Sequence, residues 1–538
     1  MQGRPEMERA PQVRRPPPLE GLAFAAAVLC GVAPLWASQL IPLVDLPQHL
    51  HLISVLHRLD DPGTLYPQIF ARRPELTPYL GYYYSVSALA WLFPLELANR
   101  LFLALTVAGL PLALAFLLSS LRRPTWPALL ALPFAWGDSF AWGFINYCAA
   151  LPLALLTAGA LVRAVEDPLG RRRWAALTAG LLVAVLLFHV QVFAFLGLAL
   201  PFLLLTTPAP DGRGWRPRVP VLLAMVPGVA LFIAWVGLRL GAPAEIAPGQ
   251  PWRSWGPMLS PQNLGWKPFA QNLADLVSFP RGGLDPQFPI LAGMLPDGAD
   301  QPAVRLVFAL ALAAVAVGLW KGRENREGPV ARWRLPGLAV LALGLFFLLP
   351  FDIRGYMYYL NTRYAHLAAA LLVASVPALP PRWSRRALLA SAAASLVLAG
   401  PLWSAFRAFD AEASGLLGLA AVTAPKPRVM GLIWAPGSRA VTHPVYLHAS
   451  CVLARERGGL TNFSFALTPH SPLQYRGPPP PTFDSEWRPD TFDWARQGAA
   501  YDHFLVKGPS AEQLFGPRLG TELEVVARAQ DFTLVRRR

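Results

Sequence analysis

The sequence predicts an all-α polytopic membrane helical bundle of about eleven spans, followed by a small C-terminal α/β extracytoplasmic domain. Only 15% of its 538 residues are charged, and 54% are hydrophobic. A soluble globular domain carries about 25% charged residues. Its hydrophobic residues also form runs of roughly 20, the length that a helix needs to cross the hydrocarbon of a bilayer. These runs recur up to about Trp403 and then stop, which separates a membrane part from a polar C-terminal part.

Short clusters of arginine and lysine separate the hydrophobic runs, which is typical of cytoplasmic loops in membrane proteins. The clusters are Arg14-Arg15, Arg122-Arg123, Arg171–Arg173, Arg213/Arg216/Arg218, Lys321/Arg323/Arg326 and Arg382/Arg385/Arg386. A nucleic-acid-binding surface would instead gather its basic residues on one folded domain with interleaved aromatic residues. We therefore expect no nucleic-acid partner, despite the formal net charge of +15.

The predicted topology places each basic cluster on the cytoplasmic side. Residues 1–19 form a disordered cytoplasmic N-terminus, residues 20–405 the transmembrane domain and residues 406–538 the extracytoplasmic α/β domain. The predicted spans are 22–43, 100–121, 125–141, 143–163, 174–190, 191–207, 219–239, 303–320, 335–351, 364–380 and 386–404. Long outer loops occupy 44–99 and 241–302. This predicts a multi-pass protein of the cell inner membrane, with its C-terminal domain periplasmic or extracellular.

The segment 78–93 is hydrophobic, but we expect it to lie along the membrane surface. It contains four tyrosines (Tyr79, Tyr82, Tyr83 and Tyr84), and tyrosine favours the membrane interface. If it crossed the membrane, every later basic cluster would face outside. In the C-terminal part, alternating and β-branched stretches predict strands at 428–433 and 501–507 and a strand pair within 523–537.

Several polar residues that a membrane scaffold does not need collect at the predicted outer ends of the spans. They are Asp45, His49, Asp138, Asn146, His189, Arg354 and Arg363. Because they lie at the ends of different spans, a compact bundle would gather them around one outward cavity. A carboxylate there suits general-base catalysis. Arginine suits a phosphate leaving group, because the guanidinium fork matches the phosphate oxygens.

Most of these residues also have a purely structural interpretation. Asp138 fits a helix cap, and Asn146 fits a hydrogen bond between helices. His189 fits a satisfied interior histidine, and Arg363 fits a side chain that snorkels to the interface. Asp45 with the histidines of segment 49–57 is an alternative site for a divalent metal, but this spacing alone is weak evidence and we expect no cofactor.

The order of these features resembles the GT-C class of membrane glycosyltransferases, which use polyprenyl-phosphate-linked sugars on the outer face of the membrane. Asp45 directly follows the first span, and the long outer loop contains the Pro-aromatic segment Thr77–Tyr84. The polar stretch Leu95–Arg100 then opens the next hydrophobic run. The resemblance covers about residues 20–405.

The resemblance implies a role for each candidate. Asp45 would be the catalytic base, Asp138 or Asn146 the second polar position, and Arg354 or Arg363 the contact to the lipid phosphate. The sequence departs from the family pattern because no acidic pair lies near Asp45 and because Asn146 stands where an acidic residue is expected. These departures leave metal dependence and catalysis itself open.

The leading hypothesis is therefore transfer of a sugar from a polyprenyl-phosphate donor to a glycan, lipid or protein acceptor, with inversion at the anomeric carbon. One alternative is a transporter or flippase for a lipid-linked solute, since transporters also keep polar residues inside the bundle. Transporters usually have symmetric halves with broken helices, which this sequence lacks. A second alternative is a non-catalytic assembly protein on the same scaffold.

Overall fold

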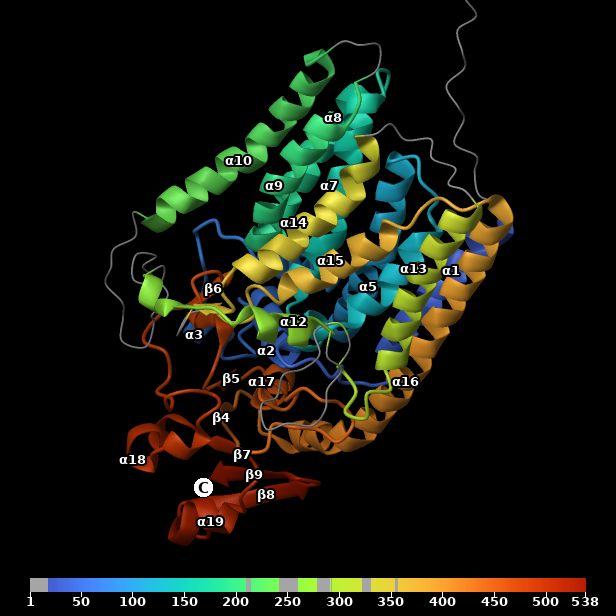
Figure 1. Cartoon of the computed structure of the whole chain (residues 1–538). Helices are drawn as coiled ribbons and strands as arrows, with labels where there is room; N and C mark the ends of the chain where they lie inside the picture. Colours follow the sequence, from blue (N-terminus) through green and yellow to red (C-terminus); the bar gives the residue numbers. More distant parts are fainter. Residues whose placement is uncertain are drawn as a thin grey trace, which may run out of the picture.

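The computed structural model describes residues 18–209, 214–240, 260–277, 291, 293–321, 330–353 and 357–538. Figure 1 shows a helical bundle with a β-sheet at one end, which contains the C-terminus. The bundle helices are α1 (Pro18–Val32), α5 (Leu95–Ser120), α7 (Ile145–Glu166), α8 (Arg171–Phe188), α9 (Val190–Thr206), α10 (Val219–Leu240), α13 (Gln301–Lys321), α14 (Arg334–Leu348), α15 (Arg363–Ala374) and α16 (Pro381–Val422). The 3-10 helix η2 (Trp126–Trp136) and the short α6 (Asp138–Ala141) complete it.

Each of the eleven predicted spans contains one of these helices, but fewer are long enough to cross a membrane unaided. Among the described residues, seven helices reach the required length and hydropathy: those within Leu19–Trp36, Leu95–Ser120, Ile145–Glu166, Arg216–Leu240, Gln301–Trp320, Ala331–Leu348 and Pro381–Val422. The apolar helices η2, α9 and α15 are shorter. Three arginines also open α8. The bundle is thus shown, and the count of eleven stays a prediction.

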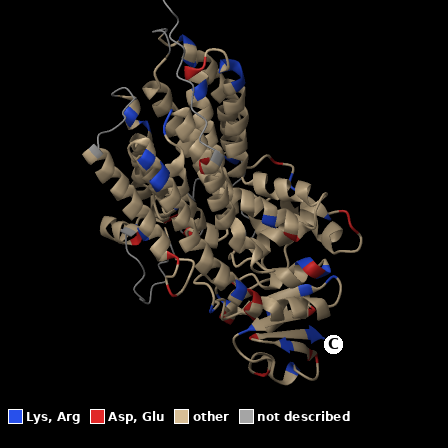
Figure 2. Cartoon of the chain, turned by 90° about the vertical axis from the view of Figure 1, so that its right-hand side faces the viewer, with Lys and Arg blue, Asp and Glu red and all other residues tan. Residues whose placement is uncertain are grey.

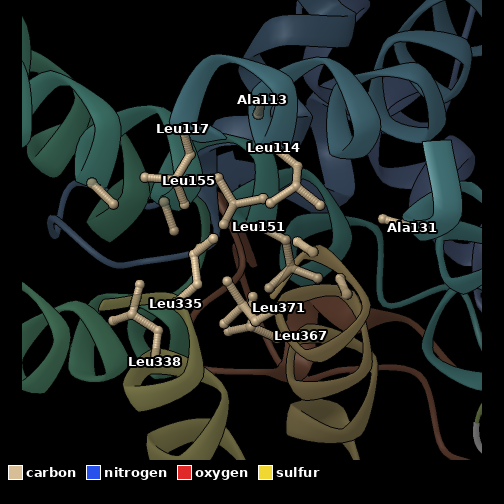
Figure 3. Close-up of a cluster of buried hydrophobic side chains, with 14 of the residues drawn as sticks. Ala113, Leu114, Leu117, Ala131, Leu151, Leu155, Leu335, Leu338, Leu367 and Leu371 are labelled. Carbon is tan, nitrogen blue, oxygen red and sulfur yellow. The ribbon is translucent and has the colours of Figure 1, made fainter. Parts of the chain in front are cut away.

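The core of the bundle lies where α5, α7, α14 and α15 meet. Figure 3 shows leucines from these helices pointing toward one another. Leu151 and Leu155 of α7 are spaced by one helical turn, as are Leu367 and Leu371 of α15, so each pair presents one face. All four are at most 4% exposed. By contrast, Leu105 on the outer face of α5 is 67% exposed, as expected of a lipid-facing surface.

The end of the bundle far from the sheet carries many arginines and lysines (Figure 2). Glu166, at the end of α7, pairs there with Arg122 and with Arg334, each at 3.2 Å. These ion pairs join the ends of α5, α7 and α14. The distribution matches the predicted basic clusters between spans.

The first outer loop contains four short elements: α2 (Leu46–His57), α3 (Tyr66–Ile69), β1 (Phe70–Arg72) and α4 (Leu80–Leu89). The ten residues of α4 span about 15 Å, which is too short for a hydrocarbon core of about 30 Å. The helix of the tyrosine-rich segment is therefore too short to cross the membrane by itself. Tyr82 and Tyr83 are buried against neighbouring helices, whereas Tyr84 is exposed.

The C-terminal part contains a five-stranded sheet with the order β5-β4-β7-β9-β8. Its strands are β4 (Arg428–Ile433), β5 (Leu460–Thr461), β7 (His503–Lys507), β8 (Leu523–Ala529) and β9 (Phe532–Arg537). Strand β4 runs parallel to β5 and β7, with Gly431 opposite Leu505, while β9 is antiparallel to β7 and β8. The strands predicted at 428–433, within 501–507 and within 523–537 are confirmed. The helices of this part are α17 (Ser450–Arg457), α18 (Trp494–Gln497) and α19 (Ala511–Phe515).

The C-terminal part is packed onto the first outer loop and onto the end of α16. Strand β1 pairs with β6 (Leu473–Tyr475), with Phe70 opposite Tyr475. Helix α17 lies beside α2 (Figure 1). Helix α16 runs for 42 residues, past residue 405, and its last turns bury Phe409 and Leu416 against the sheet side. Small elements β2 (Leu264–Gly265), β3 (Asp352–Ile353) and α12 (Phe269–Val277) complete the described chain.

Candidate active site

Asp45 occupies the position before α2, where aspartate commonly caps a helix. Its side chain makes no such cap hydrogen bond. Instead, Asp45 Oδ1 lies 3.4 Å from Nε2 of His448, and the Asp45 side chain is 19% exposed. The carboxylate is therefore directed toward the C-terminal part and keeps some access to solvent.

The backbone around Asp45 is fixed by the turn between α6 and α7. The amides of Val44 and Asp45 donate to the carbonyl oxygens of Ala141 at 3.0 Å and Trp142 at 3.1 Å. Gly143 has a φ of +87°, and a Cβ there would lie 2.9 Å from the backbone nitrogen of Asp45. Only glycine suits both the left-handed backbone and this close approach.

His448 lies between two carboxylates. Its Nδ1 is 3.8 Å from Oε2 of Glu486, on the side opposite Asp45. His448 is 2% exposed, and burial opposes its charge, but Glu486 and Asp45 together raise its pKa. Burial also raises the pKa of Glu486, against the effect of His448. The three side chains thus form one group of charged and titratable residues beside the start of α2.

His49 follows Asp45 by one helical turn and is buried among aromatic rings. Its Nδ1 lies 2.8 Å from the hydroxyl of Tyr83, and its ring meets Phe465 with centroids 5.2 Å apart. Burial lowers the pKa of His49 to about 4, although Asp45 acts in the opposite direction. His49 is therefore a neutral imidazole near pH 7.

Arg363 begins α15 and has no acidic partner among the residues that the structure describes. Its Nη1 donates to His189 Nε2 at 3.1 Å, and its guanidinium carbon lies 4.3 Å from the centroid of the Phe144 ring. Arg363 Nε is buried and has no hydrogen-bond partner. Within the described ranges no carboxylate neutralises this charge. A buried guanidinium in this state is a natural site for an anion.

A second positive region adjoins Arg363. The ring of Tyr79 contacts the rings of His189 and His470, each with centroids 4.7 Å apart. Arg239 and Arg73 hold the segment around His470 through the carbonyl oxygens of Pro469 and Ser471. Burial and then these two arginines lower the pKa of His470 to about 3. Tyr79 itself has a φ of +73°, a strained backbone of the kind that collects at functional sites.

The remaining predicted residues have partners of their own or lie elsewhere. Asp138 Oδ1 is 3.0 Å from His443 Nε2, and both side chains are buried. Asn146 Oδ1 accepts a hydrogen bond from the backbone of Tyr82 at 3.1 Å. Arg354 lies outside the described residues.

The surroundings of Asp45 and the surroundings of Arg363 meet at one turn, which contains Trp142 and Phe144. Trp142 accepts the hydrogen bond from Asp45, and Phe144, two residues later, lies under Arg363. Among the residues that the sequence analysis selected, the structure therefore places His49 near Asp45 and His189 beside Arg363, and the two pairs adjoin the same turn. It adds His448, Glu486 and His470, which the sequence analysis missed.

The alternative metal site does not assemble in the part of the chain that the structure describes. There, no group of three or more histidine, cysteine, aspartate or glutamate side chains is arranged to hold a metal ion. His51 Nε2 faces the carbonyl oxygen of Gly459 at 3.1 Å, and His57 packs on Trp91. The histidines of segment 49–57 thus have different partners.

Comparison with known proteins identifies the fold. No family model and no curated protein matches the sequence. The structure of ArnT from Cupriavidus metallidurans bound to undecaprenyl phosphate aligns with a TM-score of 0.52 and 13% identity, over 96% of this chain and 97% of that chain. The arabinofuranosyltransferase AftD from Mycobacteria aligns over 96% of this chain but 40% of its own length, with a TM-score of 0.49 and 14% identity. The fold of this chain is therefore similar to that of ArnT over nearly the whole length of both chains, in agreement with the fold that the resemblance implied.

Proposed function

We propose that this protein is a membrane glycosyltransferase that moves a sugar from a polyprenyl-phosphate carrier to a hydroxyl of an acceptor outside the cell membrane. One observation carries the proposal: the backbone of Asp45 and the guanidinium of Arg363 contact the same turn, on either side of Gly143. The Asp45 carboxylate makes no cap hydrogen bond, and no carboxylate among the described residues pairs with Arg363. A base beside an anion site is what transfer from a phosphate requires. The undecaprenyl phosphate bound to ArnT supports this class of carrier.

In the proposed reaction Asp45 is the general base. It accepts the proton of the acceptor hydroxyl as that oxygen forms a bond to the anomeric carbon of the sugar. The bond between the anomeric carbon and the phosphate oxygen breaks, and the phosphate leaves with the electron pair. A single displacement of this kind inverts the anomeric centre.

Arg363 is proposed to bind the phosphate and to stabilise the negative charge that develops on it. The ring of Phe144 holds the guanidinium from one face, and His189 accepts one of its N–H groups. The buried Nε remains to donate to a phosphate oxygen. His470 and Tyr79, whose rings are in contact, would line the phosphate site beside His189.

The proposed roles of His49, Asp138 and Asn146 follow from the residues that surround each of them. His49, neutral and beside Asp45, is proposed to contact the sugar or the acceptor. Asp138 and Asn146 are proposed to act on substrate indirectly, because each already holds the α6–α7 region through His443 or Tyr82. The acceptor is proposed to be a glycan, lipid or protein that reaches the site from the side of the C-terminal sheet.

The orientation in the membrane is also proposed. The basic end of the bundle would face the cytoplasm of a bacterium-like cell, following the positive-inside rule. The C-terminal sheet lies at the opposite end (Figures 1 and 2) and would then be periplasmic or extracellular. Asp45 and Arg363 would then lie on the outer side of the inner membrane.

The test is transfer of radiolabelled sugar from a polyprenyl-phosphate donor in membranes that contain the full chain. We expect Asp45→Asn to lower the rate by about 10²–10⁴-fold, the usual contribution of a general base, while the purified variant still binds the donor. Asp490→Asn is the matched control, because Asp490 is an exposed partner of Arg488 in the C-terminal part. The proposal fails if the folded wild type binds no donor, or if donor crosses vesicle membranes intact while no sugar is transferred.

A further inference from the structure

We propose that His448 is the positioning residue of Asp45, and that Glu486 and Gln48 hold His448 for this task. The C-terminal part would then complete the catalytic centre as well as approach the acceptor. This inference rests on the proposed function of Asp45 as the base. It concerns side chains that no sequence motif selects.

The first step is the orientation of the Gln48 amide. Its Oε1 accepts a hydrogen bond from the backbone of Phe465 at 3.3 Å, and its Nε2 donates to the carbonyl oxygen of Phe463 at 3.1 Å. These two contacts fix which end of the amide is the nitrogen. That nitrogen also lies 3.4 Å from Nδ1 of His448.

The second step is the tautomer of His448. An amide nitrogen can only donate, so Nδ1 of the neutral imidazole accepts and the ring proton sits on Nε2. Nε2 faces Oδ1 of Asp45 at 3.4 Å. When His448 takes a second proton, that proton sits on Nδ1, where Oε2 of Glu486 lies 3.8 Å away. In either protonation state, Nε2 of His448 therefore carries a proton, and it is the ring nitrogen that lies at ion-pair distance from Asp45.

The consequence is a defined role for each oxygen of Asp45. We infer that His448 attracts Oδ1, the oxygen 3.4 Å from its Nε2, which leaves Oδ2 for the hydroxyl that reacts. Asp45 cannot turn back to cap α2 without losing His448, and its backbone is fixed by Trp142. A base whose rotation is restricted in this way is pre-organised for proton transfer.

A purely structural role for His448 is the competing explanation. It is 2% exposed and connects α2 to the start of α17, so its loss would lower stability in any case. The two roles differ in what a second substitution does. A positioning residue acts only through Asp45, whereas a structural residue lowers the rate whether or not Asp45 is a carboxylate.

The experiment compares four forms of the purified full chain for sugar transfer: wild type, His448→Ala, Asp45→Asn and the double variant. We expect His448→Ala to lower kcat by up to about 100-fold with little change in KM, because displacement of a reacting group by about 1 Å can cost that much. In the Asp45→Asn background the same change should have no further effect. His448→Gln, whose amide nitrogen can stand where Nε2 was, should restore part of the rate.

His503→Gln is the matched control, because His503 is also a buried histidine beside a carboxylate, Asp502, but lies in β7. The inference would be overturned if His448→Ala lowered kcat equally in the wild-type and Asp45→Asn backgrounds, or if it changed KM alone. The thermal unfolding midpoints of the same four proteins show whether the effects of the two substitutions on stability depend on each other. This measurement separates failure of the His448 inference from failure of the proposed function. If the two substitutions have non-additive effects on the thermal midpoint but no protein transfers sugar, the proposed function is wrong. If sugar is transferred but the two substitutions act independently, the positioning role of His448 is wrong.

Discussion

The guanidinium carbon of Arg363 lies 4.3 Å from the centroid of the Phe144 ring, and no carboxylate among the described residues balances its charge. The ring contacts one face of the guanidinium, so the N–H groups that do not donate to His189 remain for an anion. A cation–π contact of this kind is worth about 0.5–2 kcal/mol. It stabilises the positive charge in an apolar setting without occupying the hydrogen bonds that a phosphate needs.

We therefore predict that Arg363→Lys weakens binding of polyprenyl phosphate although it keeps the charge. Lysine loses both the planar stacking and the fork of donors, so Kd should rise by about 2- to 30-fold. Binding can be measured by the quenching of tryptophan fluorescence on titration with the lipid in detergent. Arg386→Lys is the control, since Arg386 stacks on Trp383 near the predicted cytoplasmic end of α16. Equal affinity in wild type and Arg363→Lys would contradict the phosphate site.

Gly143 provides a second test, because it lies between the two halves of the site. Gly143→Ala would place a methyl group 2.9 Å from the backbone nitrogen of Asp45 and 3.0 Å from its Cβ, on a backbone with positive φ. We predict a loss of at least tenfold in sugar transfer, because Asp45 must move. Gly520→Ala is the matched control: its φ is +94°, but no atom lies within 4 Å of the added group. Both variants carry about the same backbone strain, so similar losses of activity would refute a steric effect on Asp45.

The sequence predicted that some residues of the candidate site lie near one another, and it did not select others. His189 and Arg363 were assigned to outer turns of different spans, and the structure joins them at 3.1 Å. The reason is that hydrophobic runs and basic clusters define where each span ends. His448 and Glu486 follow no such pattern, because polar residues are ordinary in a water-exposed part. His448 and Glu486 come near Asp45 only because the C-terminal part packs against α2. No local pattern in the sequence predicts that packing.

The number of spans was harder to predict for a related reason. A hydrophobic run shows that a segment is buried in lipid or protein, but not how its backbone is wound. The run at 125–141 forms the 3-10 helix η2, which contains Pro133, before breaking at Gly137. Eleven residues of 3-10 helix extend about 22 Å, less than the hydrocarbon thickness of about 30 Å.

Substitution of Asp138, which forms a buried pair with His443, tests whether Asp138 stabilises the fold or binds substrate. Asp138 Oδ1 and His443 Nε2 lie 3.0 Å apart, and the pair joins α6 to the C-terminal part. We predict that Asp138→Ala lowers the free energy of unfolding by about 1–3 kcal/mol, since it removes the partner of a buried polar group. Thermal unfolding followed by circular dichroism would measure this. A variant of unchanged thermal midpoint that nevertheless binds the donor more weakly would instead place Asp138 in the substrate site.

The last prediction concerns acid stability. His49 and His51 in α2 are buried, and burial lowers the pKa of each to about 4, from an ordinary value of about 6.5. Between these values the unfolded chain binds more protons than the folded chain, so the free energy of unfolding falls as pH decreases from about 6.5 to about 4. His448 has the opposite sign, because its pKa is raised: its stabilising effect is complete below about 6.5 and is lost as pH rises through its folded pKa.

His51 is the residue on which to test this, because it lies outside the proposed site and faces Gly459. His51→Gln cannot be protonated, so the thermal midpoint of the variant should fall less between pH 7 and pH 5 than that of the wild type. One pKa unit corresponds to about 1.4 kcal/mol, so the difference should be on the order of 1–2 kcal/mol at pH 5. Parallel curves for the two proteins over this range would show that His51 does not cause the acid sensitivity, and would leave His49 and His470 as its sources.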